Sequence, residues 1–142
     1  MANIGIFPPL TPELYVRNLG ESLEFYIGLL GFSICFERPE NNFATIELDG
    51  AFIMLEQIDN LDPNNDPWVT AKLEYPLGRG INFQITVTDL DGIHSRLLRY
   101  GYPIKLPLEQ KSYRTNNSFL NIRQLMIMDP DGYLLRLSQF IA

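Results

Sequence analysis

The charged side chains inside the apolar strands of this sequence are its best candidates for chemistry. Arg136 stands among leucines in YLLRLS, and Glu13 and Glu56 stand in the alternating segments TPELYV and AFIMLE. A carboxylate that is withdrawn from water can act as a general base, and a guanidinium can stabilise an enolate or bind a carboxylate. The three residues could therefore serve catalysis, ligand binding or a structural ion pair.

Nucleophilic and metal-binding chemistry has little support in the sequence. Cys35 is the only cysteine, which excludes an intrachain disulfide and a thiolate cluster, and its strand-like surroundings predict a buried, inert thiol. His94 is the only histidine, and we expect it on an exposed helix face. A single histidine cannot provide the pair of imidazoles that many metal sites use.

The composition is typical of a globular protein and excludes several function classes. The 142 residues are 46% hydrophobic and 20% charged, and their net charge is −6. Nucleic acids require basic patches, so we expect no nucleic-acid partner. The acidic balance favours a neutral or cationic small ligand, although acidity also serves solubility. There is no apolar run of membrane-helix length and no signal-peptide pattern, so we expect a cytoplasmic protein without a membrane partner.

Two copies of one pattern organise the chain. Residues 14–32 and 85–102 each begin as a strand, continue with an Asn or Asp that can cap a helix, and end at a glycine. Asn18, with Glu21 three residues later, resembles a capping box, and Asp89 is a good N-cap in the second copy. The pattern predicts a strand followed by a helix in each half.

A β-hairpin follows in each copy. LDGAFIMLEQ, residues 48–57, parallels PDGYLLRLSQ, residues 130–139, and Asp-Gly between alternating apolar runs is a strong hairpin signal. The sequence therefore predicts one α+β domain over residues 1–142. It consists of two tandem βαβββ modules at about 9–57 and 80–139.

Two segments lie outside this repeat. The linker at 58–79 is rich in Pro, Asn, Asp and Gly, which predicts a loop with a short helical turn. A loop of this length is often functional, and Trp68, the only tryptophan, could cap a ligand groove or pin the linker to the core. Residues 108–121 predict a second irregular stretch that is partly a hairpin.

The sequence resembles the vicinal oxygen chelate superfamily, which holds glyoxalase I, extradiol dioxygenases and the bleomycin resistance proteins. The resemblance is carried by VRNLGESLEFYIGLLGF, ITVTDLDGIHSRLLRYG and DPDGYLLRLSQ. The C-terminal motif and the SYR before it are most similar to the bleomycin-resistance-like branch. The resemblance implies a curled, partly open mixed barrel with the helices outside. It also implies a homodimer with a ligand site at or near the subunit interface.

Metal-dependent relatives hold their ligands at four positions that face the cavity. The resemblance places these positions at Thr11, Met54, Asn82 and Arg136. A thioether and a guanidinium cannot replace imidazole and carboxylate ligands, because the guanidinium has no lone pair to give. We therefore expect no metal and no other cofactor. The remaining metal hypothesis is a three-carboxylate site for a hard cation, made by Glu13, Glu47 and Glu56.

Strand alternation predicts which side chains line the resulting groove. Apolar residues in each strand should face the helices, and the residues between them should face the concavity. Phe119 is a further candidate for stacking on a ligand. The predicted ligand-binding residues are Glu13, Tyr15, Phe36, Phe52, Met54, Glu56, Trp68, Asn82, Gln84, Tyr113, Gln124 and Arg136.

Three functions are compatible with the resemblance and these residues. The first is a metal-free protein that sequesters a bulky, cationic aromatic compound between subunits, through aromatic stacking and acidic side chains. The second is a lyase or isomerase of the superfamily with an altered or lost metal site, with Glu13 or Glu56 as base and Arg136 as electrostatic partner. The third is an accessory protein whose fold only supports dimerisation. We favour the binding protein.

Overall fold

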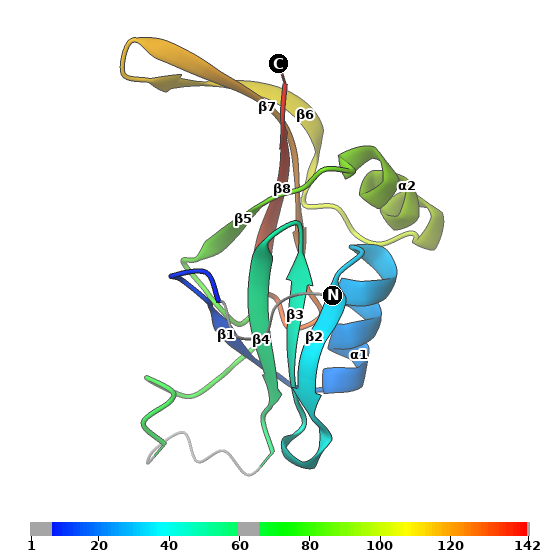
Figure 1. The fold of residues 1–142 in the computed structure, drawn as a ribbon, viewed down its shortest axis with the longest axis vertical. Helices are drawn as coiled ribbons and strands as arrows, with labels where there is room; N and C mark the ends of the chain where they lie inside the picture. The colour runs from blue at the N-terminus through cyan, green and yellow to red at the C-terminus, as the bar shows by residue number, and fades with distance from the viewer. Residues whose placement is uncertain (1–6, 60–65, 142) are drawn as a thin grey trace.

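Two four-stranded sheets, one from each half of the chain, form the framework of the protein (Figure 1). The computed structural model describes residues 7–59 and 66–141. The first half contains β1 (Glu13–Val16), α1 (Leu19–Leu23), the π-helical turn η1 (Glu24–Leu29), β2 (Ser33–Arg38), the 3-10 turn η2 (Pro39–Asn41), β3 (Phe43–Leu48) and β4 (Ala51–Gln57). The second half contains β5 (Asn82–Thr86), α2 (Leu90–Tyr100), β6 (Leu106–Thr115), β7 (Ser118–Met128) and β8 (Leu134–Phe140).

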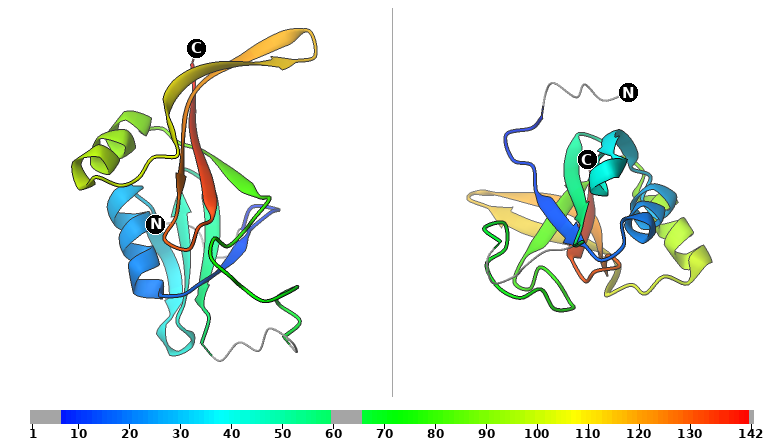
Figure 2. Two further views of the ribbon diagram at one scale, coloured as in Figure 1. Left: turned by 180° about the vertical axis from the view of Figure 1, so that it is seen from behind. Right: turned by 90° about the horizontal axis from the view of Figure 1, so that it is seen from below.

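Each half folds as a βαβββ unit. The strand before the helix pairs in parallel with the last strand of its own half, and the other pairs are antiparallel. The resulting orders are β1-β4-β3-β2 in sheet A and β5-β8-β7-β6 in sheet B. Both helices lie on the same side of the molecule (Figure 2). The predicted α+β class, with a curled sheet framework and no closed barrel, is confirmed.

The predicted caps define the ends of the helices. Asn18 Oδ1 accepts the backbone N–H of Glu21 at 2.9 Å, and Asp89 Oδ1 accepts that of Gly92 at 3.0 Å. Gly101 ends α2 in the left-handed conformation with φ 66°, which costs glycine little. After one turn α1 widens into η1, which the amphipathic pattern did not predict. Among the described helices, none combines the length and apolar character that a bilayer crossing requires.

One core joins the two halves. The sequence correctly placed the inward faces of four strands, and these residues are buried: Leu14, Val16, Ile53, Leu55, Ile85, Val87, Tyr133, Leu135 and Leu137. Ile81 was expected on this face but is 54% exposed, because it precedes β5. Cys35 was expected to be buried but is half-buried, at a bulge where β2 shifts register against β3.

The segment at 108–121 corrects the sequence prediction. It lies in a long, regular hairpin of β6 and β7, whose turn contains Asn116 in the left-handed conformation. The hairpin extends beyond the rest of sheet B (Figures 1 and 2). Its outer part is exposed on both faces, so the sequence there lacks the apolar alternation that identifies a strand.

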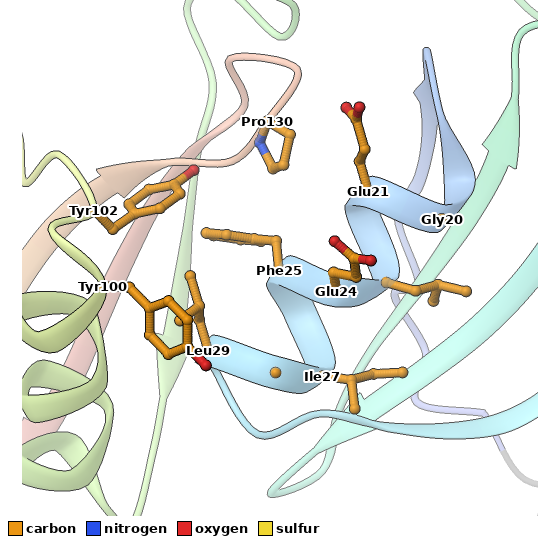
Figure 3. A pocket seen from close by; sticks show the side chains of 11 residues that line it. Gly20, Glu21, Glu24, Phe25, Ile27, Leu29, Tyr100, Tyr102 and Pro130 are labelled. Carbon is orange, nitrogen blue, oxygen red and sulfur yellow. The ribbon is translucent and has the colours of Figure 1, made fainter.

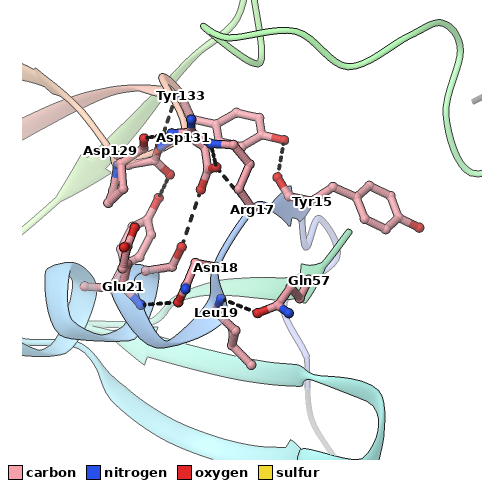
Figure 4. A network of polar contacts seen from close by, with 12 residues as sticks. Tyr15, Arg17, Asn18, Leu19, Glu21, Gln57, Asp129, Asp131 and Tyr133 are labelled. Carbon is pink, nitrogen blue, oxygen red and sulfur yellow. Dashed lines mark hydrogen bonds and ion pairs between the residues drawn. The ribbon is translucent and has the colours of Figure 1, made fainter. Parts of the chain in front are cut away.

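A hairpin carboxylate from each half holds the strand–helix junction of the other half. Asp131 Oδ1 accepts both the backbone N–H and the Nε–H of Arg17, each at 2.9 Å (Figure 4). Asp49 Oδ2 accepts the backbone N–H of Thr88 at 2.9 Å. Arg17 and Thr88 are equivalent positions of the repeat, and so are the two aspartates. The halves therefore bind each other through a reciprocal exchange.

The two contacts of this exchange differ in burial. Asp131 is 1% exposed, whereas Asp49 is exposed. Asp129 shapes the turn that carries Asp131, because its carboxylate accepts the backbone N–H of Asp131 and of Tyr133. It also accepts the hydroxyl of Tyr26 at 2.6 Å, and burial raises the pKa of Asp129 to about 6. The turn between β7 and β8 is thus buried against residues of the first half.

This difference predicts unequal costs for two equivalent substitutions. Asp131→Ala should lower the free energy of unfolding by about 2–3 kcal/mol, because it removes charge-assisted hydrogen bonds in a buried place. Asp49→Ala should cost less than about 1 kcal/mol, because water can replace the exposed carboxylate. Urea unfolding of both variants measures the difference, and equal costs would contradict the asymmetry.

Candidate functional site

An acidic cavity of about 710 Å³ lies on the face of sheet A that points away from the core. Five carboxylates and a single guanidinium contribute to its lining. The lining residues are Glu13, Tyr15, Arg38, Glu40, Asn41, Asn42, Glu56, Gln57, Asp59, Asp66 and Trp68. We call this space the acidic cavity.

Strand pairing explains why its central side chains meet. β1 and β4 run parallel, with Tyr15 opposite Glu56 and Glu13 opposite Met54. Leu14 and its neighbours in the alternation are buried in the core, so these four side chains point to the other face, where Glu13, Tyr15 and Glu56 line the cavity and the predicted site residue Met54 does not. The sequence pattern therefore determines this part of the cavity.

Burial and mutual repulsion alter the titration of the cavity's side chains. Burial raises the pKa of Glu13, the negative charge of Glu56 raises it further, and Arg38 opposes both effects. Burial and the same two carboxylates raise the pKa of Tyr15 to about 12. The phenol of Tyr15 therefore keeps its proton at neutral pH, and the carboxylates gain from a bound cation.

The linker supplies one wall of the acidic cavity. Trp68 is 74% exposed, and its backbone N–H donates to the carboxylate of Asp66 at 2.9 Å. The sequence left open whether Trp68 caps a groove or pins the linker. Its indole lines the acidic cavity and is not buried in the core. Residues 60–65 of the linker lie outside the described part.

The predicted aromatic residues Phe36 and Phe52 lie on the same sheet but outside the cavity lining. Phe7 packs edge-on against both, with ring centroids 6.0 Å from Phe36 and 5.7 Å from Phe52. Arg38 lies over the ring of Phe43 at 4.0 Å. Arg38 was not among the predicted site residues, although it lies two residues after Phe36 and shares its face by alternation.

The remaining predicted site residues lie on sheet B and do not line the acidic cavity. Gln84 is opposite Arg136 in the register of β5 and β8. Gln124 is 2% exposed, and its Nε2 donates to Glu109 Oε1 and to the Tyr113 hydroxyl, each at 2.8 Å. The sheet B group of predicted residues is Asn82, Gln84, Tyr113, Gln124 and Arg136.

The structural ion pair of Arg136 with Glu13 or Glu56, which the sequence left open as an alternative to a ligand site, does not form among the described residues. Ion pairs among the described residues join Arg17 to Asp131, Lys72 to Glu74 and Arg123 to Asp91. Arg136 lies on sheet B and both glutamates lie on sheet A. Its Nε is buried without a hydrogen-bond partner in the described part of the chain.

The side chains at the four metal positions do not fit a divalent metal. A hydroxyl, a thioether, an amide and a guanidinium occupy them, at Thr11, Met54, Asn82 and Arg136. The three-carboxylate hypothesis of Glu13, Glu47 and Glu56 is contradicted as well. Within residues 7–59 and 66–141, no group of three or more His, Cys, Asp or Glu side chains is placed to hold a metal ion.

Comparison with known proteins identifies the family. Residues 9–137 match the family model described as the Glyoxalase/Bleomycin resistance protein/Dioxygenase superfamily. The chain belongs to this superfamily. A superfamily member from Vibrio splendidus 12B01 shares 37% identity over 89% of this chain and 94% of its own, with a TM-score of 0.41. A search of curated proteins finds no match.

Two further solved structures share the fold. A virulence protein from Salmonella typhimurium is 22% identical, with a TM-score of 0.65, over 96% of this chain and 98% of its own. TioX from Micromonospora sp. ML1 is 18% identical, with a TM-score of 0.67, over 93% of this chain and 98% of its own. At these identities the likeness extends to the fold alone.

The Arg136 guanidinium on sheet B, whose Nε is buried without a partner among the described residues, is expected to lower the stability of the protein. Arg136→Met should raise the free energy of unfolding of the ligand-free protein by about 1 kcal/mol, because methionine fills the space without burying an unpartnered Nε. Thermal unfolding, with Arg114→Met on the exposed ribbon as the control, measures the effect. A loss of stability specific to Arg136→Met would show that the guanidinium has a structural partner.

Proposed function

We propose that the protein binds a cationic aromatic small molecule in the acidic cavity and does so without a metal. The observation that carries this proposal is the combination of five carboxylates with one guanidinium around one space, beside the exposed indole of Trp68. A cation there neutralises charges that otherwise repel each other. The indole face adds cation–π attraction and stacking for an aromatic ligand.

Glu13 in this site is partly removed from water, unlike a carboxylate on an ordinary charged surface. The pKa of Glu13 is raised mainly by burial, so its carboxylate is partly removed from water. Attraction between opposite charges is stronger in such surroundings than in bulk solvent. The cavity volume of about 710 Å³ suits a molecule of drug size. Sequestration, as in the bleomycin resistance proteins of the superfamily, is the function we favour.

The enzyme alternative has weaker support from the geometry. It requires a carboxylate base and Arg136 at one reacting centre. Glu13 and Glu56 line the acidic cavity, whereas Arg136 lies on the other sheet and outside the lining. Within the described residues, the cation beside the two glutamates is Arg38, which lies over Phe43. A binding role uses the observed neighbours directly.

We also propose that a second copy of the chain covers the outer part of the β6–β7 hairpin. The outer part of the β6–β7 hairpin has no third strand, because β8 ends with Phe140 opposite Ile122. Isolated two-stranded ribbons are marginally stable in water. Phe119 is 64% exposed and Phe140 is 59% exposed at this ribbon. A partner that covers these rings would stabilise the ribbon and form a groove between subunits.

Calorimetric titration tests the ligand class. Bleomycin, a polar cation that carries an aromatic group, should release heat on binding and quench Trp68 fluorescence. Glu13→Gln and Glu56→Gln should each weaken binding about tenfold, equivalent to about 1.4 kcal/mol. Glu37→Gln is the control, because Glu37 belongs to the same sheet but lies outside the cavity lining. Equal effects from all three substitutions would contradict the assigned site.

The affinity for a cation should depend on pH. Glu13 attracts a cation only when it is deprotonated, and its pKa is raised from 4.5. Binding should therefore be strong at neutral pH and decline as the pH falls through this raised pKa. In the Glu13→Gln variant, the decline in cation affinity that remains should occur at lower pH. Titrations between pH 7 and 4 measure both curves, and coincident curves would exclude Glu13.

Sedimentation equilibrium tests the partner. We expect the protein to be a dimer, and Phe119→Ser with Phe140→Ser should shift it to monomer. Leu98→Ser on α2 is the matched control, because Leu98 is 60% exposed and distant in sequence from the ribbon. A cationic ligand should also strengthen the dimer if the groove is shared. A monomeric wild-type protein would refute this part of the proposal.

A further inference from the structure

A second hollow lies on the helical side of the protein and shares no residue with the acidic cavity (Figure 3). It has a volume of about 820 Å³ and runs between α1–η1 and the end of α2. Its walls are apolar and aromatic. They include Phe25, Ile27 and Leu29 from η1 and Tyr100, the last residue of α2. We call it the helical groove.

The π-helical turn opens the floor of the helical groove. η1 carries Gly28, and a Cβ added there would meet no atom within 4 Å. Glycine in a helix interior lowers stability by about 0.5–1 kcal/mol relative to alanine. Gly28 therefore does not stabilise the helical turn in which it lies. π-helical turns also occur frequently at functional sites. The floor is therefore an unfilled space next to an open solvent face.

One wall of the helical groove is fixed by packing and a hydrogen bond, and the other is exposed. The hydroxyl of Tyr102 donates to the carbonyl of Met128 at 2.6 Å, and its ring lies 5.1 Å from that of Phe25. Phe25 is 3% exposed. Tyr100, in contrast, is 72% exposed and lines the solvent side of the groove. Such a preformed apolar surface beside an exposed aromatic ring suits a small ligand.

The charge at the rim is negative. Glu21 and Glu24 line one end, and their side chains lie three residues apart on the same helical face. Among the lining residues, none is basic. Two guanidinium groups bind next to the lining without belonging to it: Arg96 donates to the carbonyl of Leu29, and Arg17, whose charge also acts on Glu21, donates to the carbonyl of Pro130. A cation at this rim would separate two like charges.

We propose that the helical groove is a second binding site, for a hydrophobic small molecule with one positive charge. The apolar body would lie against Phe25, Leu29 and Tyr102, and the charge would lie between Glu21 and Glu24. This inference does not depend on the acidic cavity, whose lining is mainly polar and charged. The two sites differ in the ligand that they select: a polar cation for the cavity and an apolar monocation for the groove.

Tetraphenylphosphonium and its isosteric anion tetraphenylborate test the proposal with the full chain. Calorimetry should detect binding of the phosphonium and none of the borate. Glu21→Gln with Glu24→Gln should weaken phosphonium binding about tenfold. Gly28→Leu should abolish it by filling the floor, with Ser95→Leu on exposed α2 as a control that adds the same side chain elsewhere. Circular dichroism checks that both leucine variants are folded.

Trp68 separates this site from the acidic cavity. It lines the cavity and not the groove, so phosphonium binding in the groove should leave its fluorescence unchanged. Glu13→Gln should also leave the binding unchanged. Equal affinity for cation and anion would overturn the charge assignment. Binding that persists in Gly28→Leu, or that follows Glu13→Gln, would overturn the site itself. Failure of the cavity proposal would instead appear only with the polar cations.

Discussion

The exchange of hairpin carboxylates between the two halves is the contact on which the rest of the structure depends. Asp131 accepts the N–H where the first helix begins, and Asp49 does the same for the second. Backbone N–H groups at such junctions lack partners within their own helix. Each junction therefore takes one backbone hydrogen bond from the other half, one residue before the N-cap that its own half supplies. The Arg17 guanidinium strengthens the more buried of the two contacts.

This exchange separates the two outward faces of the sheets. Both sheets turn their apolar faces to one shared core, so their polar faces become independent surfaces. Sheet A gathers Glu13, Glu56 and the linker residue Trp68 around the acidic cavity. Sheet B carries Arg136 with its unpaired Nε. The outward faces of the two sheets thus carry different groups: carboxylates gather on sheet A, and a buried guanidinium nitrogen without a partner among the described residues lies on sheet B.

The sequence predicted what is local and missed what depends on distant packing. The caps at Asn18 and Asp89, the Asp-Gly hairpins and the apolar faces follow from short patterns, and the structure confirms them. The pairing of Arg136 with a glutamate failed, because alternation identifies a face but not what lies opposite it. The outer ribbon was predicted only in part, as an irregular stretch with some hairpin, since the side chains there are exposed on both faces and show no apolar alternation. The helical groove had no signal, because a π turn leaves no distinct pattern.

The position of Trp68 has an evolutionary consequence. The linker that carries it contributes Leu77 to the shared core, whereas Trp68 itself is 74% exposed and takes no part in the contacts of Asp49 and Asp131 between the halves. Insertions or substitutions beside Trp68 can therefore reshape one wall of the acidic cavity while the framework stays fixed. Selection for a new ligand can act on exposed residues beside Trp68 whose substitution costs the fold little stability. In a duplicated fold of this kind, the residues that contact a ligand can change faster than the arrangement of the strands and helices.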